Sequence, residues 1–300
     1  MKAFVFPGQG SQFLGMFSPF ISSEFEPFIN ELQKLDLNLL NIYEKGPEES
    51  IKETRYSQPA IFSVSSMLDY FLKKNNIIPD YVAGHSLGEY SAFYSAGIFN
   101  FSQGLALVYE RGRLMHEISQ EVSGGMWAII GGDRKEIEES IRDIENLWIA
   151  NYNSLEQIIL SGKVESFNIW QEKMKNKVKR IVPLSVSGPF HCPLMKKAQE
   201  KFYELLKDFV FKDPQIPVIS STIGEEIKNG KEAKEVLVLQ FTSPVLWVNT
   251  LSKLNSLGIS EFIEVGPGKV LQGLIKKTLS SVKILGIENP KDLEKLKGEE

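Results

Sequence analysis

Hydrophobic residues along the chain follow two patterns: short apolar runs typical of buried strands, and stripes at helical spacing typical of amphipathic helices. The apolar runs predict strands over residues 2–6, 80–83, 217–220, 261–265 and 283–287. The stripes predict helices over 25–40, 58–74, 87–96, 102–118, 193–209, 232–240, 248–257 and 270–279. Strands that alternate with helices in this way indicate an α/β fold with a mostly parallel sheet.

Residues 124–184 show a different order of elements. Strand patterns at 126–130, 147–150, 157–161 and 178–184 enclose helix patterns at 134–144 and 164–175. This β-α-β-β-α-β order is the split βαβ, ferredoxin-like arrangement, which can fold as an insertion in another domain. We therefore predict a small domain over 123–188, inserted into a large domain made of 1–122 and 189–300. The charged segment 290–300 is expected to fray.

Composition narrows the class of protein. Of the 300 residues, 42% are hydrophobic and 24% charged, as in an ordinary globular enzyme with a substantial core. A formal net charge of −4 leaves no basic excess to neutralise phosphates, so nucleic acid is not expected as a partner. No apolar run approaches the ~20 residues of a membrane span, and the opening apolar run is too short for a signal peptide. The single cysteine, Cys192, favours a reducing compartment, and we expect a cytoplasmic protein.

The first chemical signal is a Gly-x-Ser-x-Gly turn from Gly84 to Gly88, with Ser86 at its tip. A predicted strand precedes the turn and a predicted helix follows it, which is the layout of a nucleophile elbow. Glycine is needed where the chain bends so tightly that a side chain would collide. The helix that follows directs free N–H groups towards charge beside Ser86. The alternative is a plain strand-to-helix turn.

A second turn follows the first predicted strand, with Gln9 between Gly8 and Gly10. Two glycines around a polar side chain suggest backbone that approaches a ligand closely. An ordinary turn explains the same pattern, and the sequence does not choose between the two. The Gly-Lys-Ser/Thr ending of a phosphate-binding loop is missing.

Arg111 lies within the apolar stripe of its predicted helix, between Leu107–Val108 and Leu114–Met115, whereas Arg113 lies off the stripe. A buried arginine is costly unless an anion or several acceptors meet it. One interpretation is a structural ion pair with a buried carboxylate. The other is a guanidinium that holds a ligand carboxylate through two parallel hydrogen bonds. Periodicity alone favours neither.

A serine hydroxyl needs a base to accept its proton, and the chain has three histidines. His85 adjoins Ser86, and its side chain should point away from that of Ser86. His116 is expected near the end of a helix as a solvated cap. By elimination we predict His191 as the general base, with a structural histidine as the alternative. No acid is an obvious partner for it, so a backbone carbonyl or an amide is expected to orient the imidazole.

Eight segments together resemble the malonyl-CoA:acyl carrier protein transacylases, the acyltransferases of fatty acid synthesis. They are FPGQGSQ (6–12), QPA (58–60), GHSLGEYSA (84–92), RGRLM (111–115), ANYNS (150–154), FHCPLM (190–195), QFTSPVLW (240–247) and EVGPGKVL (264–271). The resemblance implies an α/β-hydrolase-like large domain that carries a ferredoxin-like small domain. Phe190 before His191 resembles the malonyl-selecting form of that motif and modestly favours malonyl.

The resemblance also implies residue roles. Ser86 resembles the nucleophile and His191 the base, while Arg111 resembles the anchor for the malonyl carboxylate. Gln9 and Leu87 resemble the residues whose backbone N–H groups form the oxyanion hole. Gln240 matches a residue whose main-chain carbonyl orients the histidine, which would account for the missing acid.

The predicted activity is transfer of malonyl from malonyl-CoA to the phosphopantetheine thiol of acyl carrier protein through a malonyl-serine. No metal or redox cofactor is expected, and we expect a monomer. The family's carriers are typically acidic, so candidates for a docking patch are Lys196–Lys197, Lys276–Lys277 and Arg180. The alternatives are a serine esterase or thioesterase, a non-catalytic carrier-docking subunit, and the acyltransferase of a polyketide pathway.

Overall fold

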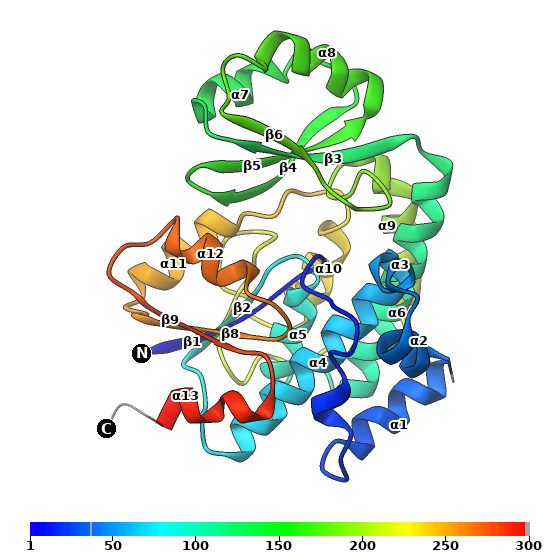
Figure 1. The fold of residues 1–300 in the computed structure, drawn as a ribbon, viewed down its shortest axis with the longest axis vertical. Helices are drawn as coiled ribbons and strands as arrows, with labels where there is room; N and C mark the ends of the chain where they lie inside the picture. Colours follow the sequence, from blue (N-terminus) through cyan, green and yellow to red (C-terminus); the bar gives the residue numbers. More distant parts are fainter. Residues whose placement is uncertain (37, 298–300) are drawn as a thin grey trace.

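A computed structural model describes residues 1–36 and 38–297, and Figure 1 shows two sheets of different size, one above the other. The larger sheet has the strand order β7-β2-β1-β8-β9, and all of its neighbouring strands are parallel. Its strands are β1 (Lys2–Phe6), β2 (Tyr81–Gly84), β7 (Val218–Ile219), β8 (Glu261–Val265) and β9 (Lys283–Ile287). The prediction of an α/β fold with a parallel sheet is confirmed.

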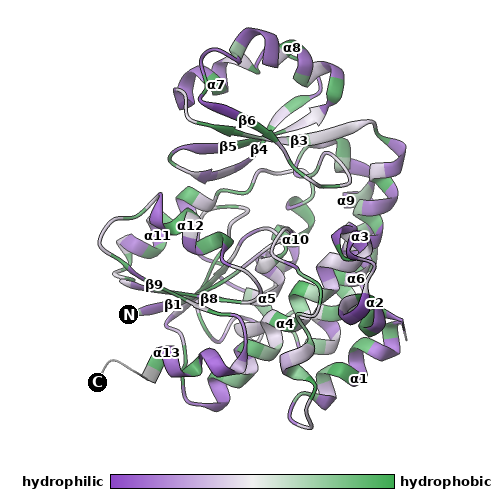
Figure 2. Ribbon diagram, in the orientation of Figure 1, coloured by the Kyte–Doolittle hydropathy of each residue, from purple (hydrophilic) through white to green (hydrophobic). Residues whose placement is uncertain are grey.

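Side chains along these strands alternate between two cores, one on each face of the sheet. Phe4 and Phe6 of β1 belong to the larger core, and Ala3 and Val5 belong to the smaller one. The larger core is covered by helices α4 (Thr54–Lys74), α5 (Gly88–Ser95), α6 (Phe101–Glu121), α9 (Lys196–Leu206) and α10 (Gly230–Leu239). The smaller core lies under α11 (Trp247–Ser256) and α12 (Val270–Lys276). Helices therefore cover both faces, and the strands are mostly apolar (green in Figure 2), although β1, β8 and β9 each begin with a charged residue.

The smaller sheet, at the top of Figure 1, is antiparallel with the strand order β4-β5-β3-β6. Its elements are β3 (Gly124–Ile130), α7 (Arg134–Ser140), β4 (Leu147–Ser154), β5 (Gln157–Lys163), α8 (Val164–Met174) and β6 (Arg180–Pro183). The two helices pack on one face, where the rings of Trp127 and Phe167 stack 3.8 Å apart. Met126, Ala128 and Ile159 on the other face join the core of the large sheet. The domain boundaries at 123 and 188 stay a prediction.

The predicted helix over 25–40 is wrong, because the chain forms two helices there. They are α1 (Glu26–Leu35) and α2 (Leu39–Lys45), and α3 (Glu48–Lys52) follows. Asp36 adopts an extended backbone, and its carboxylate accepts a hydrogen bond from the backbone N–H of Asn38 at 2.8 Å. A side chain that bonds its own neighbouring backbone in this way competes with helix formation. Residue 37 lies outside the described residues.

The C-terminal segment was expected to fray from residue 290, and this is wrong for its described part. Pro290–Leu293 forms a 3-10 helix and Glu294–Lys297 a short α-helix, α13. The side chains of Asn289 and Asp292 cap the first of these, and Leu293 is buried. Residues 298–300 lie outside the described residues.

Among the described residues, no helix combines the length and apolar character that crossing a membrane requires.

Candidate active site

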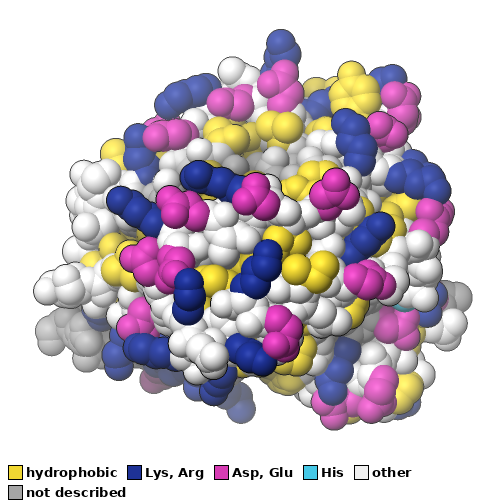
Figure 3. Space-filling view, turned by 90° about the horizontal axis from the view of Figure 1, so that it is seen from above, with side chains coloured by type: hydrophobic (Ala, Val, Ile, Leu, Met, Phe, Trp, Pro, Cys, Tyr) yellow, Lys and Arg dark blue, Asp and Glu magenta, His cyan; other side chains and the backbone are white. Residues whose placement is uncertain are grey.

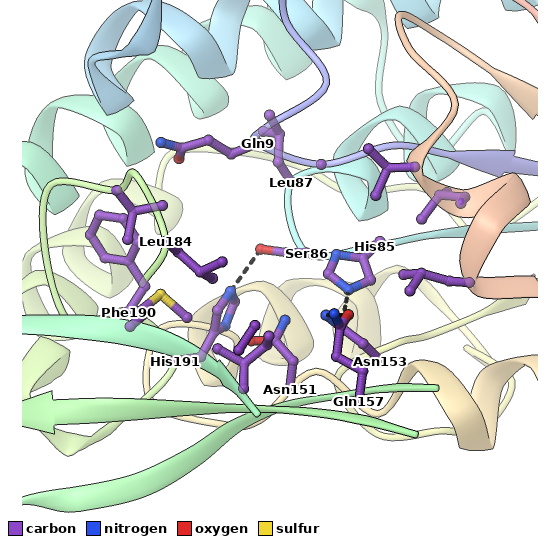
Figure 4. A pocket seen from close by; sticks show the side chains of 18 of the residues that line it. Gln9, His85, Ser86, Leu87, Asn151, Asn153, Gln157, Leu184, Phe190 and His191 are labelled. Carbon is purple, nitrogen blue, oxygen red and sulfur yellow. Dashed lines mark hydrogen bonds between the residues drawn. The ribbon is translucent and has the colours of Figure 1, made fainter. Parts of the chain in front are cut away.

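A cavity of about 240 Å³ lies between the two sheets. Its wall contains the turns after β1 and β2, one side of α6 and α12, and the face of the small sheet opposite its helices. Because β1 and β2 are parallel neighbours, their carboxyl ends lie at the same edge, where Phe6 pairs with Gly84. The turns that carry Gln9 and Ser86 therefore lie close together, and both line the cavity (Figure 4).

Ser86 lies at the tip of a strand-to-helix bend. β2 ends at Gly84 and α5 begins at Gly88, and Ser86 has a φ of 52°, a left-handed conformation that non-glycine residues seldom adopt. A Cβ atom on Gly84 would lie 2.0 Å from the Gly88 carbonyl, and one on Gly88 would lie 2.0 Å from the Phe6 oxygen. Both glycines are required for the close approach, which holds Ser86 at the cavity with a strained backbone.

The Ser86 hydroxyl lies 2.7 Å from Nε2 of His191, as the dashed line in Figure 4 shows. On the other side of the ring, Nδ1 of His191 lies 2.9 Å from the backbone oxygen of Gln240. A carbonyl can only accept, so Nδ1 carries the proton and Nε2 presents its lone pair to the serine. Burial, together with the Arg111 charge, lowers the pKa of His191 to about 3. The imidazole is therefore neutral near pH 7 and able to accept a proton.

Arg111 is 1% exposed and reaches the same serine from α6. Its Nη1 donates to Oε1 of Gln58 at 2.8 Å, and its Nη2 donates to the Ser86 hydroxyl at 3.2 Å. Both partners are neutral, and within the described part of the chain no carboxylate lies within 4 Å of its nitrogens. The structural ion pair considered from the sequence is thus not formed. Arg113 is exposed and pairs with Glu110 and Glu117 on the surface.

Gln9 and Leu87 lie across the cavity from His191 (Figure 4). The Gln9 side chain donates to the Thr54 hydroxyl at 3.1 Å, which fixes the turn after β1. Leu87 directly precedes α5, where helix geometry leaves the first backbone N–H groups without a partner in the helix. Within residues 1–36 and 38–297, neither the Gln9 nor the Leu87 backbone N–H donates to a protein acceptor.

The other two histidines differ from each other. His85 points away from the serine, as predicted, and its Nε2 lies 2.8 Å from Oδ1 of Asn153 on the small sheet. His116 was expected as a solvated cap, and this is wrong: α6 continues to Glu121, so His116 lies within the helix and is half-buried. Its backbone oxygen accepts a hydrogen bond from Ser119. His116 does not line the cavity.

The polar residues of the small sheet and Glu89 were not predicted from the sequence to belong to the site. Asn151, Asn153 and Gln157 line the cavity opposite the elbow. The ANYNS and GHSLGEYSA segments contain these residues, but polar side chains in a strand or helix do not reveal which cavity they face.

Among the described residues, no cluster of three or more His, Cys, Asp or Glu side chains could hold a metal ion. The expectation that no cofactor is needed stays a prediction.

Comparison with known proteins identifies the family. The family model described as acyl transferase domain matches residues 3–296. The chain is 38% identical to the malonyl CoA-acyl carrier protein transacylase of Bacillus subtilis, over 97% of this chain and 95% of that protein. An acyl carrier protein S-malonyltransferase of Vibrio cholerae superposes with a TM-score of 0.93 at 32% identity, covering 98% of this chain and 99% of the other.

A third relative was solved together with its partner. It is a malonyl-transacylase in complex with the acyl-carrier protein of a type II polyketide synthase, with a TM-score of 0.92 at 33% identity and coverage of 98% and 97%. The fold, the cavity and these similarities agree over nearly the whole length of the chain. The chain belongs to the acyl transferase family and is an acyltransferase.

Proposed function

We propose that this enzyme transfers the malonyl group of malonyl-CoA to the phosphopantetheine thiol of an acyl carrier protein, through a malonyl ester of Ser86. The observation that carries the proposal is the convergence of two groups on one oxygen. Oγ of Ser86 lies 2.7 Å from Nε2 of His191 and 3.2 Å from Nη2 of Arg111. A base that activates the nucleophile and a cation that suits a carboxylate therefore meet at the same atom.

In the first half-reaction His191 accepts the proton of Ser86 as Oγ attacks the thioester carbonyl of malonyl-CoA. The negative charge that develops on the carbonyl oxygen is stabilised by the backbone N–H groups of Gln9 and Leu87. The carbon–sulfur bond then breaks, and the thiol of coenzyme A leaves with the proton from His191. Malonyl-CoA is a substrate here, and the step uses only groups of the chain and of the substrate.

The second half-reaction reverses the first with a different thiol. His191 takes the proton of the carrier's phosphopantetheine thiol, and the sulfur attacks the malonyl ester. The bond to Oγ breaks, and His191 returns the proton to Ser86. A thioester is exchanged for a thioester, so the overall reaction is nearly isoenergetic and reversible.

Arg111 supports malonyl over a neutral acyl group. A hydrolase of neutral esters gains nothing from a guanidinium that is 1% exposed beside its nucleophile. Nε of Arg111 is buried, and no described residue accepts its hydrogen. A carboxylate can accept two parallel hydrogen bonds from an arginine, which would balance both the charge and the unused donor.

The kind of carrier and the cell compartment are inferred from the similar proteins and from the single cysteine. The similar proteins include one named for acyl carrier protein without further specification and one bound to a polyketide carrier, so carriers of fatty acid and of polyketide synthesis are both candidates. Cys192, the only cysteine, is buried and free. A single free thiol is typical of a reducing compartment, and we place the reaction in the cytoplasm.

The test is mass spectrometry of the intact protein mixed with malonyl-CoA. We expect one added malonyl group, which maps to the Ser86 peptide and disappears when a carrier thiol is supplied. Ser86→Ala should not form it. An adduct on Cys192, or release of the malonyl group to water at the rate of transfer to the carrier, would contradict the proposal and favour another nucleophile or a hydrolase.

A further inference from the structure

Glu89 is a buried carboxylate that the proposed mechanism does not use. It lies in the first turn of α5, three residues after the nucleophile, and it is 0% exposed. A carboxylate is costly to bury unless its oxygens are hydrogen-bonded. No acid could be predicted from the sequence to orient His191. The hydrogen-bond partners of Glu89 therefore show whether this carboxylate contributes to the catalytic site.

Four donors surround the Glu89 carboxylate. Oε1 accepts hydrogen bonds from the Ser220 hydroxyl and from the backbone N–H of Ser221 at 3.0 Å. Oε2 accepts from the Thr222 hydroxyl at 2.8 Å and from Nε2 of Gln240 at 2.7 Å. Burial raises the pKa of Glu89, and these hydrogen bonds oppose that shift. Each donor suits an ionised carboxylate, which only accepts.

Gln240 links this carboxylate to the catalytic pair. The Nε2 that donates to Glu89 also donates to the backbone oxygen of Ser86 at 2.9 Å. The backbone oxygen of Gln240 accepts from Nδ1 of His191 at 2.9 Å. Because Gln240 directly follows α10, it belongs to a helix end that the side chain fixes to the elbow. The position of the carbonyl relative to Ser86 thus depends on the bond to Glu89.

We propose that Glu89 is a positioning residue for the acyl transfer, which anchors the Gln240 side chain so that its backbone carbonyl orients His191 towards Ser86. The inference rests on the proposed function. The acid of a Ser-His-acid arrangement is thereby replaced by a carboxylate that acts through one amide, from the same turn as the nucleophile.

The test is Glu89→Gln, which preserves shape and removes the charge. The backbone N–H of Ser221 requires an acceptor at the Oε1 position, so the NH2 group of the glutamine amide takes the Oε2 position. There the Thr222 hydroxyl can turn to accept, but Nε2 of Gln240 is a donor and loses its anchor. We expect the rate of Ser86 malonylation at saturating malonyl-CoA to fall roughly 10- to 100-fold, the lower part of the range for losing general-base help. The Michaelis constant for malonyl-CoA should change little, because the Arg111 bonds to Gln58 and Ser86 remain.

Asp69→Asn is the matched control. Asp69 is a buried carboxylate of α4 that accepts hydrogen bonds from Ser95 and pairs with Lys73, and it does not line the cavity. Its loss should lower the free energy of unfolding and leave the malonylation rate unchanged. If both variants lower stability alone, Glu89 is a structural residue and the proposal is overturned.

A double-mutant cycle with Gln240→Ala tests the route of the effect. This variant keeps the backbone carbonyl but removes the amide that Glu89 holds. If Glu89 acts through Gln240, then Glu89→Gln should lower the rate much less in the Gln240→Ala background than in the wild type. Losses that multiply independently would overturn the proposal.

A second variant covers the case in which Glu89→Gln does not fold. Thr222→Val removes one donor to Oε2 with little change of shape, and its smaller rate loss should also vanish in the Gln240→Ala background. A Thr222→Val effect that persists there would equally overturn the proposal.

Failure of the proposed function can be distinguished from failure of the role of Glu89. If the wild type forms no malonyl-Ser86, the proposed function fails. If the wild type forms it and folded Glu89→Gln reacts at the wild-type rate, only the role of Glu89 fails.

Discussion

Two buried charged clusters in the large α/β part differ in whether the fold itself balances their charges. On α4, Asp69 lies 2.9 Å from Nζ of Lys73, one helical turn away, and 2.6 Å from the Ser95 hydroxyl. On α6, Arg111 is as deeply buried, and its hydrogen bonds within the described residues go to the neutral side chains of Gln58 and Ser86. The first cluster is complete within the chain, whereas the second has a cation and a base directed at a cavity.

The difference separates stability from function. A buried ion pair that is complete costs free energy when one partner is removed, because the other is left without a counter-charge. A buried cation without an ionic partner is a cost that a ligand carboxylate can offset. Changes in the cavity cluster should therefore alter acyl transfer more than folding, and changes in the Asp69 cluster should do the opposite.

The largest expected effect is that of removing the base. His191→Ala should lower malonyl transfer roughly 10²- to 10⁴-fold, the range for losing general acid–base help. His85→Ala and His116→Ala should act mainly through stability, because neither contacts the Ser86 hydroxyl. The measurement is the rate of transfer to a carrier thiol, with folding checked by thermal unfolding. A dead His116→Ala enzyme that is folded would show that the base was assigned wrongly.

The pH dependence of stability tests the same residue. The pKa of His191 is lowered by burial to about 3 in the fold, against about 6.5 in an unfolded chain. Between these values the unfolded chain binds a proton that the folded chain does not, so stability is present above pH 6.5 and is lost as pH falls. At pH 5 this residue should cost about 2 kcal/mol of unfolding free energy. His191→Gln should lose less stability than the wild type between pH 7 and 5, measured by urea unfolding.

Arg111→Ala should lower malonyl transfer by at least ~10²-fold, since hydrogen bonds between charged groups contribute about 1.5–3 kcal/mol each. Transfer of acetyl from acetyl-CoA should be unharmed or improved, because acetyl has no carboxylate. Arg111→Lys should recover little, since an ammonium does not reproduce the planar arrangement of donors. Arg113→Ala is the control on the same helix and should leave both rates unchanged. Equal loss of both activities in folded Arg111→Ala would refute the carboxylate anchor.

Asp69→Asn should show the opposite behaviour. The substitution removes the counter-charge of Lys73, and the one amide oxygen it introduces cannot replace both carboxylate oxygens that meet Lys73 and Ser95. We expect a cost of about 3 kcal/mol, the lower end for a broken buried pair because Lys73 is partly exposed. The transfer rate at 25 °C should stay within twofold of the wild type. A rate that falls in step with Arg111→Ala would remove the distinction between the two clusters.

The sequence predicted most of the fold because strands and helices follow local periodicity. It failed at residues 25–40, where the Asp36 side chain bonds the backbone of Asn38, and at the C-terminus, where Asn289 and Asp292 cap a short helix. Both failures come from side chain-to-backbone hydrogen bonds that hydrophobic patterning does not record. The family and the fold are confirmed, while the domain boundaries stay a prediction.

Some residues of the candidate site could be predicted from the sequence, some only from resemblance, and others were missed. Ser86 and His191 could be identified from a turn motif and by elimination among three histidines, and the structure brings their side chains within 2.7 Å. The roles of Gln9, Leu87 and Gln240 came only from resemblance, because these residues contribute backbone groups that any residue could supply. The glycines around Gln9 left a ligand-binding turn and an ordinary turn equally open. Glu89 was missed because its two partner segments, Ser220–Thr222 and Gln240, lie more than 130 residues further along the chain. The roles of all six predicted site residues stay proposals.

The smallest expected effect extends the comparison to the surface, where the carrier must dock. Basic and acidic side chains are interspersed on the face that Figure 3 shows, and Lys197 pairs with Glu121 at 2.6 Å. Lys276 and Lys277, at the end of a helix that lines the cavity, have no described carboxylate within 4 Å.

Among the described residues, neither Lys276–Lys277 nor Arg180 has a carboxylate within 4 Å, whereas Lys197 is paired. Lys276–Lys277 lies at the end of α12, which lines the cavity, and β6 with Arg180 does not line it, so Lys276–Lys277 is the preferred patch for an acidic carrier. Reversing both charges to Glu should raise the Michaelis constant for the carrier several-fold, since exposed ion pairs contribute only about 0.2–1 kcal/mol each. The constant for malonyl-CoA should not change, because neither lysine lines the cavity. Lys196–Lys197 reversed in the same way is the control, together with Arg180→Glu on the small sheet. Steady-state kinetics with both substrates varied decides the matter: equal changes in the two constants, or a larger effect at Lys196–Lys197, would move the docking site away from α12.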